Sequence, residues 1–207
     1  MMTERSKGNI PVRNGLGEVM AMLIGASTGG PKALLQMLPD LSEKVNIPII
    51  IVPHMPVGFT KSLAKSIDLK CRHTAVECEN KRVIENDYRY LAPAWKHLEL
   101  QRDTKGRVVT LLTESLPENG CRPSVDVLFR SASGVYGNDS IAIVLTGMVK
   151  DGTNGLVFIE NAGAYTIAQD EESRVVWGMP GSAVNAGLVV DKVASIESIP
   201  DVVSVLV

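Results

Sequence analysis

Short apolar runs alternate with segments of helical spacing along most of the chain. Val19 to Ala26 is a continuous apolar run, Pro31 to Leu41 carries leucines at helical intervals, and Pro48 to Val52 is apolar again. Continuous apolar runs are typical of strands that are buried on both faces, and a helical segment between two of them completes a strand, helix, strand unit. The pattern therefore predicts parallel strands joined by helices.

The rest of the chain extends this pattern with one interruption. Further helices are expected at 59–67, 124–135, 152–161 and 181–186, further strands at 74–78, 88–92, 98–102, 108–113, 141–146 and 165–168, and a last apolar element at 199–206. The middle strands, from 88 to 113, are separated by turns, which predicts antiparallel hairpins. The expected fold class is α/β, with a doubly wound, mainly parallel sheet, helices on both faces and an antiparallel hairpin addition.

Composition limits the number of domains and the kinds of partner. The chain has 207 residues, 45% of them hydrophobic, which suffices for one domain with a sizeable core. Residues 1–17 show little periodicity and are expected to form a flexible N-terminal tail before a folded domain at 18–207. The net charge of -2 and the lack of a dense Lys/Arg block give no footprint for nucleic acid. No apolar run approaches the roughly 20 residues that span a bilayer, so no membrane insertion is expected.

The cysteines and the polar amino-terminal segment bear on location and cofactors. Three cysteines are an odd number, and the first residues lack an apolar targeting segment, which fits a reducing cytoplasm. Cys71-x-His73 with Cys78 offers the side-chain types of a metal site. A second paired cluster at zinc spacing is missing, so reduced thiols and an exposed histidine are expected instead. No metal or organic cofactor is expected.

One serine lies in a run of small residues directly after the first expected strand. The stretch from Gly25 to Gly29, GASTG, satisfies G-x-S-x-G between a strand and a helix, where this motif exposes a nucleophilic serine. The first amides of the helix can also stabilise an oxyanion. Two rival interpretations are that Ser27 or Thr28 caps the helix, and that the stretch binds phosphate. The Walker and full G-x-G-x-x-G spacings are both absent, which argues against a phosphate loop.

A serine nucleophile needs a base, and the chain offers three histidines. His54 follows the second expected strand as Ser27 follows the first, so in a parallel sheet both emerge at the same carboxyl edge. His73 and His97 lie in polar stretches and are expected at solvated surface positions. His54 is therefore the expected base.

The third member of such a site is a carboxylate that fixes the histidine tautomer. Asp151 is the first candidate because it follows an apolar strand and precedes a helix, although this position also suits an N-cap. Asp170 is the second candidate, and Asp126 is interpreted as a helix-start charge. The order serine, histidine, aspartate differs from that of the α/β-hydrolases, so an ordinary member of that class is not expected.

Several segments resemble, in order, the catalytic domain of the chemotaxis protein-glutamate methylesterases, the CheB family. They are IGASTGGP, PHMPVGFT, YLAPAWKHLEL, RPSVDVLFRSAS, IVLTGMVKDGTNG and YTIAQDEESRVVWGMPGSAVNAG. The resemblance implies a bacterial, cytoplasmic hydrolase of glutamate γ-methyl esters that also deamidates certain glutamines and needs no cofactor. It further implies that the substrates are cytoplasmic helices of methyl-accepting chemotaxis receptors.

The resemblance also carries over residue by residue. The family's serine, histidine and aspartate fall on Ser27, His54 and Asp151, and positions associated with the oxyanion fall on Thr28 and Met148. The family usually has an amino-terminal receiver domain, and this chain has only the short tail before the catalytic segments. It is therefore either a stand-alone methylesterase, for which a separate receiver protein is a candidate partner, or an excised catalytic domain.

One departure from the family pattern concerns the backbone. Val149 stands where the family usually has glycine, and a β-branched residue resists positive φ. A shift at this position would misplace Met148 or Asp151.

Two expectations remain open at this point. Met55, Phe59, Trp177 and Met179 are expected near the same sheet edge, with 177–180 as a loop, while core packing is the alternative for any one of them. For function, the alternatives are a catalytically weak or inactive binding module of the same fold and a nucleotide-binding domain.

Overall fold

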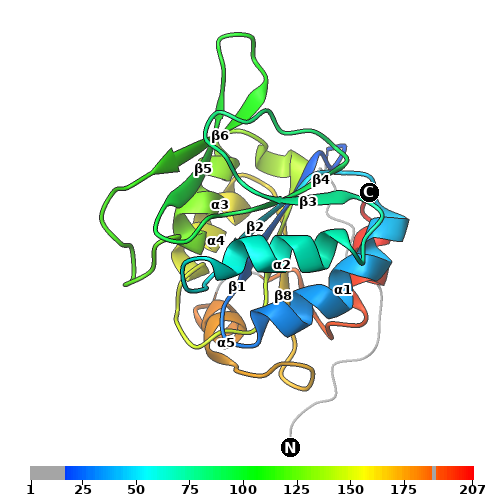
Figure 1. Ribbon diagram of the computed structural model, residues 1–207. Helices are drawn as coiled ribbons and strands as arrows, with labels where there is room; N and C mark the ends of the chain where they lie inside the picture. Colours follow the sequence, from blue (N-terminus) through cyan, green and yellow to red (C-terminus); the bar gives the residue numbers. More distant parts are fainter. Residues whose placement is uncertain (1–16, 188–189) are drawn as a thin grey trace, which may run out of the picture.

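The computed structural model describes residues 17–187 and 190–207 of the chain (Figure 1). Seven strands form the main sheet in the order β3-β4-β2-β1-β7-β8-β9, and all of its neighbours pair in parallel. The strands are β1 (Ala21–Ala26), β2 (Ile49–Pro53), β3 (Thr74–Glu77), β4 (Tyr88–Leu91), β7 (Ser140–Val144), β8 (Tyr165–Gln169) and β9 (Lys192–Ala194). The predicted doubly wound sheet is confirmed. The predicted tail lies outside the described residues, apart from Gly17.

Helices cover both faces of this sheet, as the sequence predicts. They are α1 (Gly30–Lys44), α2 (Phe59–Asp68), α3 (Val125–Ser133), α4 (Thr153–Asn161), α5 (Gly178–Asn185) and α6 (Ile199–Ser204), with a 3-10 turn η1 (Gly137–Asp139). Figure 1 shows α1 and α2 in front of the sheet and α3 and α4 behind it. Successive residues of β1 point to opposite sides: Met22 and Ile24 enter the core that contains Leu34 of α1, and Leu23 enters the core that contains Leu128 of α3.

One hairpin projects from the body of the molecule. β5 (His97–Arg102) and β6 (Val108–Thr113) pair antiparallel and form a separate two-stranded sheet, which reaches upward in Figure 1. The prediction that β4 also belongs to an antiparallel hairpin was wrong, because β4 pairs in parallel with β3 and β2. An apolar run indicates that a strand is buried but leaves the direction of its partner open, and residues 78–87 carry the chain back to the starting end of the sheet.

The strand order reverses next to β1. The chain passes from β1 to β2 on one side and later adds β7 on the other side. At such a reversal the connecting loops diverge at the carboxyl edge of the sheet, which is where open α/β sheets bind their ligands. At the opposite edge, a cavity of about 430 Å³ is lined by both Gly17 and Val207. Among the described residues, none of the helices has the length and apolar character needed to cross a membrane.

Candidate active site

Ser27 lies in the tight connection between β1 and α1. Its backbone N–H donates to the carbonyl of Thr146 at 2.9 Å, and its own carbonyl accepts from Gly30 N at 2.7 Å. Gly29, the N-cap residue of α1, has φ of 83°, a conformation that glycine adopts without a steric cost. The serine side chain is partly exposed. The sequence prediction of a strand, a sharp turn and a helix around Ser27 is confirmed.

Gly147, in the loop after β7, packs directly against the serine. A Cβ atom at this position would lie 2.8 Å from Ser27 Cβ and would collide with the sulfur of Met179. The carbonyl of Gly147 accepts from Met179 N at 2.9 Å, and its N–H donates to Val176 O at 3.3 Å. The absence of a side chain at 147 therefore lets two loops meet at the serine.

Thr146 connects the loops around the serine through hydrogen bonds. Its hydroxyl donates to the carbonyl of Thr28 at 2.9 Å and accepts from Val176 N at 2.8 Å. Its backbone N–H donates to Oε1 of Gln169, the last residue of β8, at 2.9 Å. Because Thr146 and Gln169 are buried, losing these bonds would leave polar groups unsatisfied. The loops after β1, β7 and β8 are therefore held in fixed relation.

His54 lies beside the serine loop at the end of β2. Its N–H donates to the carbonyl of Ala26 at 2.8 Å, and its Nε2 lies 2.9 Å from Oδ2 of Asp151. In the described part of the chain, no hydrogen bond joins the imidazole to the hydroxyl of Ser27. Such bonds are often long in the absence of substrate and shorten when it binds.

Asp151 is fully buried and accepts several hydrogen bonds besides the one to His54. Oδ2 accepts from Val125 N at 2.6 Å, and Oδ1 accepts from the hydroxyl of Ser124 at 2.7 Å and from Asp126 N at 3.1 Å. These donors belong to the N-terminus of α3, whose positive end favours a carboxylate. The N-cap of α4 is the next residue, Gly152. Asp151 therefore serves the start of α3 as well as the histidine.

Hydrogen bonds favour the charged forms of His54 and Asp151. Burial lowers the pKa of His54, but its hydrogen bonds with Asp151 and Cys121 outweigh burial and raise the pKa to about 9. Burial raises the pKa of Asp151, but hydrogen bonds from His54, Val125 N and Ser124 outweigh it and hold the pKa below its usual range. The pair therefore stabilises an imidazolium, the species formed when the ring takes a proton from a nucleophile.

The two residues expected at the oxyanion position are exposed beside the serine. Thr28 follows Ser27 directly, and Met148 follows Gly147, which contacts the serine. Within the described residues, the structure records no hydrogen bond for the backbone N–H of either one. Two amide donors are thus available near Ser27.

Val149 does not disturb this arrangement. Among the described non-glycine residues, positive φ occurs at Lys81, Trp95 and Asn119 and not at Val149. The side chain of Val149 is partly buried and packs against the core under α3. The backbone strain expected from a β-branched residue here is therefore absent.

The other two histidines are buried, so the prediction of surface positions was wrong. Nδ1 of His73 accepts from the guanidinium of Arg89 at 2.7 Å. Nδ1 of His97 accepts from Ser124 N at 3.2 Å, and its Nε2 donates to Leu116 O at 3.1 Å. Both histidines have polar neighbours in the sequence, which suggested surface positions. They are buried because residues far along the chain form hydrogen bonds with each ring.

The alternative carboxylates have other partners. Asp170 accepts from the N–H and the hydroxyl of Ser173, at 2.9 and 2.7 Å, so the structure brings Asp151 rather than Asp170 to His54. Asp126 lies in the first turn of α3, as predicted, but is fully buried. Its carboxylate accepts from Asn119 Nδ2 at 2.6 Å and from Gly155 N of α4 at 2.5 Å.

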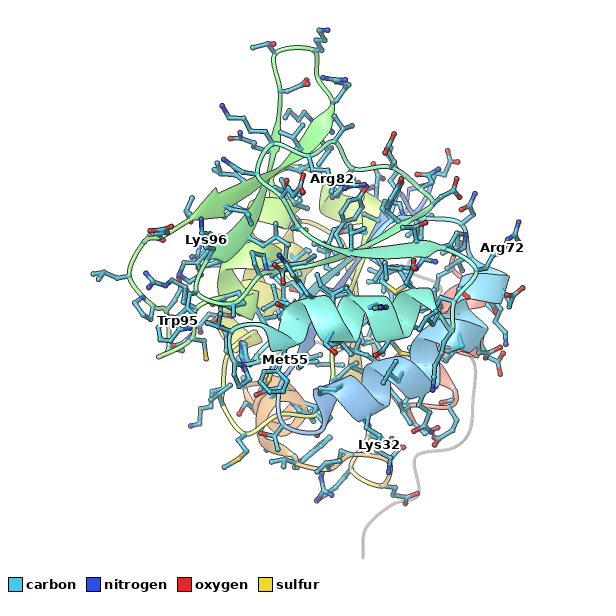
Figure 2. All side chains as sticks on the ribbon, viewed as in Figure 1. Lys32, Met55, Arg72, Arg82, Trp95 and Lys96 are labelled. Carbon is cyan, nitrogen blue, oxygen red and sulfur yellow. The ribbon has the colours of Figure 1, made fainter. Side chains whose placement is uncertain are left out.

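The expected edge residues divide into exposed and buried ones. Trp177 is the N-cap residue of α5, so 177–180 begins a helix rather than forming a loop, and Met179 is fully buried. Phe59 is 58% exposed at the start of α2, and Met55 is partly buried. Figure 2 shows Met55 and Trp95 on the side of the molecule where β2 ends, and Arg72 on the opposite side.

Sequence reasoning missed Cys121, which lies at the site. Its sulfur is 3.9 Å from Nδ1 of His54. A single cysteine far from the histidine in sequence gives no motif that would reveal this contact. The group suggested by spacing does not assemble, because Cys78 is buried in the core under α3 whereas His73 binds Arg89.

Comparison with known proteins gives one consistent family. A family model described as CheB methylesterase matches residues 22–203. A protein-glutamate methylesterase/protein-glutamine glutaminase of Desulfotalea psychrophila is 44% identical over 175 residues, which are 84% of this chain and 48% of that protein. A relative of the same name from Pyrococcus abyssi is 37% identical over 200 residues, 97% of this chain and 52% of its own length. The chain thus spans about half the length of the curated relatives it matches.

A solved structure agrees with these sequence relatives. The crystal structure of the Thermotoga maritima CheB methylesterase catalytic domain superposes with a TM-score of 0.87 at 38% identity, covering 92% of this chain and 100% of that one. The matched residues 22–203 of the family model include Ser27, His54 and Asp151.

Proposed function

Because the chain belongs to the CheB methylesterase family, we propose that it hydrolyses γ-methyl esters of glutamate side chains and deamidates glutamines. Ser27 is the nucleophile, His54 the base and Asp151 the acid that orients the base. The observation that carries the proposal is the 2.9 Å contact between His54 and the buried Asp151, next to a serine at the reversal of strand order.

The first half-reaction forms an acyl-serine. His54 takes the proton of the Ser27 hydroxyl while the serine oxygen attacks the γ-carbonyl carbon of the methyl ester. Since Nε2 faces Asp151, the accepting nitrogen is Nδ1. The ring then returns the proton to the departing methoxide, and methanol leaves. With a glutamine substrate the same steps release ammonia.

The second half-reaction releases a glutamate carboxylate. His54 removes a proton from a water molecule, the resulting hydroxide attacks the acyl-serine, and the serine oxygen recovers its proton from the ring. The amides of Thr28 and Met148 donate to the oxyanion in both halves. Removing one such donor typically costs roughly 100- to 1,000-fold in turnover.

The substrates proposed for this chain are cytoplasmic helices of methyl-accepting chemotaxis receptors in bacteria. A protein substrate needs an open approach to the serine. Loops beside the site and the start of α2 carry large apolar side chains in exposed positions, namely Val57, Phe59, Trp95, Met148 and Val175. Exposed apolar side chains around a site are typical of surfaces that receive another protein.

Methanol release from methylated receptor tests the reaction. Replacing Ser27 by Ala should reduce the rate at least about 10³-fold, because the acyl intermediate forms on the hydroxyl that this change removes. Ser62→Ala, at an exposed position of α2, is the matched control and should keep the wild-type rate. Equal rates for the wild type and Ser27→Ala would rule out the serine mechanism.

A serine-directed fluorophosphonate probe separates this proposal from that of an inactive module. The wild-type protein should be labelled, and Ser27→Ala should remain unlabelled. An unreactive Ser27 in a folded wild-type protein would favour the binding module.

A further inference from the structure

A thiol lies next to the free nitrogen of the base. Cys121 Sγ is 3.9 Å from Nδ1 of His54, whereas Nε2 of the same ring faces Asp151. The possible ligand atoms of Cys121, His54 and Asp151 all lie within 4.8 Å of one another. Among the residues that the structure describes, this is the one group of three or more His, Cys, Asp or Glu side chains that could hold a metal ion. Thiolate and imidazole are the preferred ligands of Zn²⁺.

The separation of the two ligand atoms suits a shared metal ion. A Zn–N bond of about 2.1 Å and a Zn–S bond of about 2.3 Å at a tetrahedral angle place the two atoms about 3.6 Å apart. The observed 3.9 Å therefore requires a shift of a few tenths of an ångström. His54 and Cys121 also line a cavity of about 180 Å³, which has room for an ion with water ligands.

Asp151 prepares the imidazole for a metal. Its Oδ2 accepts from Nε2 and keeps a proton on that nitrogen, so the proton that the charged ring releases comes from Nδ1, whose lone pair is then directed at the thiol. Zinc-binding histidines commonly have such a carboxylate partner on the other ring nitrogen. Since Asp151 is fixed by Ser124 and by Val125 N, it can orient the ring without leaving its place.

Cys121 is held rigidly by the turn that carries it. Glu118 and Cys121 exchange backbone hydrogen bonds of 3.0 and 2.8 Å. Both carboxylate oxygens of Glu118 accept from Arg130 of α3, at 2.9 and 2.7 Å. Asn119, inside the turn, donates to Asp126 at 2.6 Å. Rigid support of this kind is what a precise ligand site requires.

We propose that a thiophilic divalent cation, best matched by Zn²⁺, binds between His54 Nδ1 and Cys121 Sγ with water in its remaining positions. On binding, the thiol and the charged imidazole ring each lose one proton to solvent, from Sγ and from Nδ1, and the thiolate and Nδ1 each donate a lone pair to the metal. The metal then occupies the lone pair that accepts the proton of Ser27. Metal binding therefore inhibits hydrolysis. This inhibition rests on the proposed function, whereas metal binding does not.

Cobalt binding tests the site without any assay of activity. Co²⁺ is added to the reduced, metal-free protein, and a thiolate bound to Co²⁺ gives a charge-transfer band in the near ultraviolet. The band should appear in the wild type and in Cys71→Ser, the matched control with a half-buried thiol elsewhere. It should be absent from Cys121→Ser and Cys121→Ala, and His54→Gln should weaken Co²⁺ binding at least about tenfold. Two different substitutions of Cys121 are made in case one of them prevents folding, and circular dichroism checks that each variant is folded.

Zinc inhibition provides the second measurement. Zn²⁺ should inhibit methanol release by the wild type, and EDTA should restore it. The zinc concentration for half-inhibition should rise at least about tenfold in Cys121→Ser, each variant being compared with its own zinc-free rate. A cobalt band that survives in Cys121→Ser, or no band in the wild type at millimolar Co²⁺, would overturn the site. Equal zinc sensitivity of the wild type and Cys121→Ser would overturn the inhibition. A cobalt band in a protein without hydrolytic activity would reject the proposed function and leave the metal site standing.

Discussion

Single residues at this site have more than one task, and Asp151 is the clearest case. Its carboxylate orients His54 and also accepts hydrogen bonds from the first residues of α3. The same buried group therefore couples the chemistry of the site to the stability of the fold. Any substitution of Asp151 is therefore expected to change both the activity of the site and the stability of the fold.

Replacing Asp151 by Asn should lower methanol release roughly 10³- to 10⁴-fold, because an amide cannot balance the imidazolium and favours the wrong tautomer. The free energy of unfolding should also fall by about 1 to 3 kcal/mol, since buried donors of α3 lose a charged acceptor. Kinetics and urea unfolding measure the two effects. Asp170→Asn is the matched control and should keep the wild-type rate. An unchanged rate in Asp151→Asn together with a reduced rate in Asp170→Asn would assign the role of orienting His54 to Asp170 instead.

Gly147 should not tolerate even one added methyl group. In Gly147→Ala the new Cβ would meet Ser27 Cβ and Met179, so the loop that carries the serine must move. The free energy of unfolding should fall by about 1 to 3 kcal/mol. Turnover should fall too, even under conditions in which the variant stays folded. Gly134→Ala is the control, because a Cβ there meets its nearest atom at 3.7 Å and φ is -75°. Wild-type turnover in Gly147→Ala would show that the close approach at 147 is not needed.

Residues that continue a local pattern were predictable, and those defined by distant partners were not. Ser27, His54 and Asp151 each follow an apolar strand, and that placement was enough to predict that all three lie at the same edge of the sheet. His97 and Cys121 have no such marker. His97 is buried because Ser124 N and Leu116 O satisfy its ring, and Cys121 reaches the site through a turn that no apolar pattern announces.

At the scale of elements, α3 is the support of the site. Its N-terminus binds Asp151, its side chain Arg130 holds the turn of Cys121, and Asp126 links it to α4 through Gly155. Burial, with repulsion from Asp151, outweighs the amide of Gly155 and raises the pKa of Asp126 to about 6. A buried carboxylate in this position makes the α3–α4 contact sensitive to pH.

The stability of the fold should depend on pH through the carboxylate of Asp126. The folded protein binds a proton on Asp126 more tightly than the unfolded chain, whose pKa is about 3.9, so stability from this group is lost as pH rises through 6. Relative to Asp126→Asn, the wild type should lose about 1 kcal/mol between pH 5 and 7.5. Urea unfolding at the two pH values measures it, and a difference that does not change with pH would contradict the prediction.

Element types were predictable where periodicity was strong, and their pairing was less so. The helix after Ser124 lies where its cap predicts, and that hydroxyl accepts from Val127 N. β4 was assigned to the wrong kind of pair because its apolar residues fit a buried strand in either direction. Pairing direction depends on the return path of the chain, which local pattern does not encode.

The molecule as a whole places apolar side chains around one edge. Phe59 and Trp95 are both more than half exposed there, at the start of α2 and in the loop between β4 and β5. A minority of the residues in a binding surface, with Trp enriched among them, cost more than about 1 kcal/mol when they are truncated. The chemistry at Ser27 does not require them.

Phe59→Ala and Trp95→Ala should therefore raise KM for methylated receptor roughly five- to tenfold and leave kcat on a small soluble ester nearly unchanged. Leu69→Ala is the control, because Leu69 is exposed at the other end of α2. Steady-state kinetics on the two substrates give the comparison. Equal losses on both substrates would mean that these residues support the site itself instead of docking.

The cavity lined by Gly17 and Val207 lies at the amino edge of the sheet, across the molecule from Ser27. An affinity tag or fluorescent reporter joined to the carboxyl group of Val207 therefore starts at the edge opposite Ser27. Immobilisation on a sensor chip through Val207 would thus present the edge with Ser27 to solution.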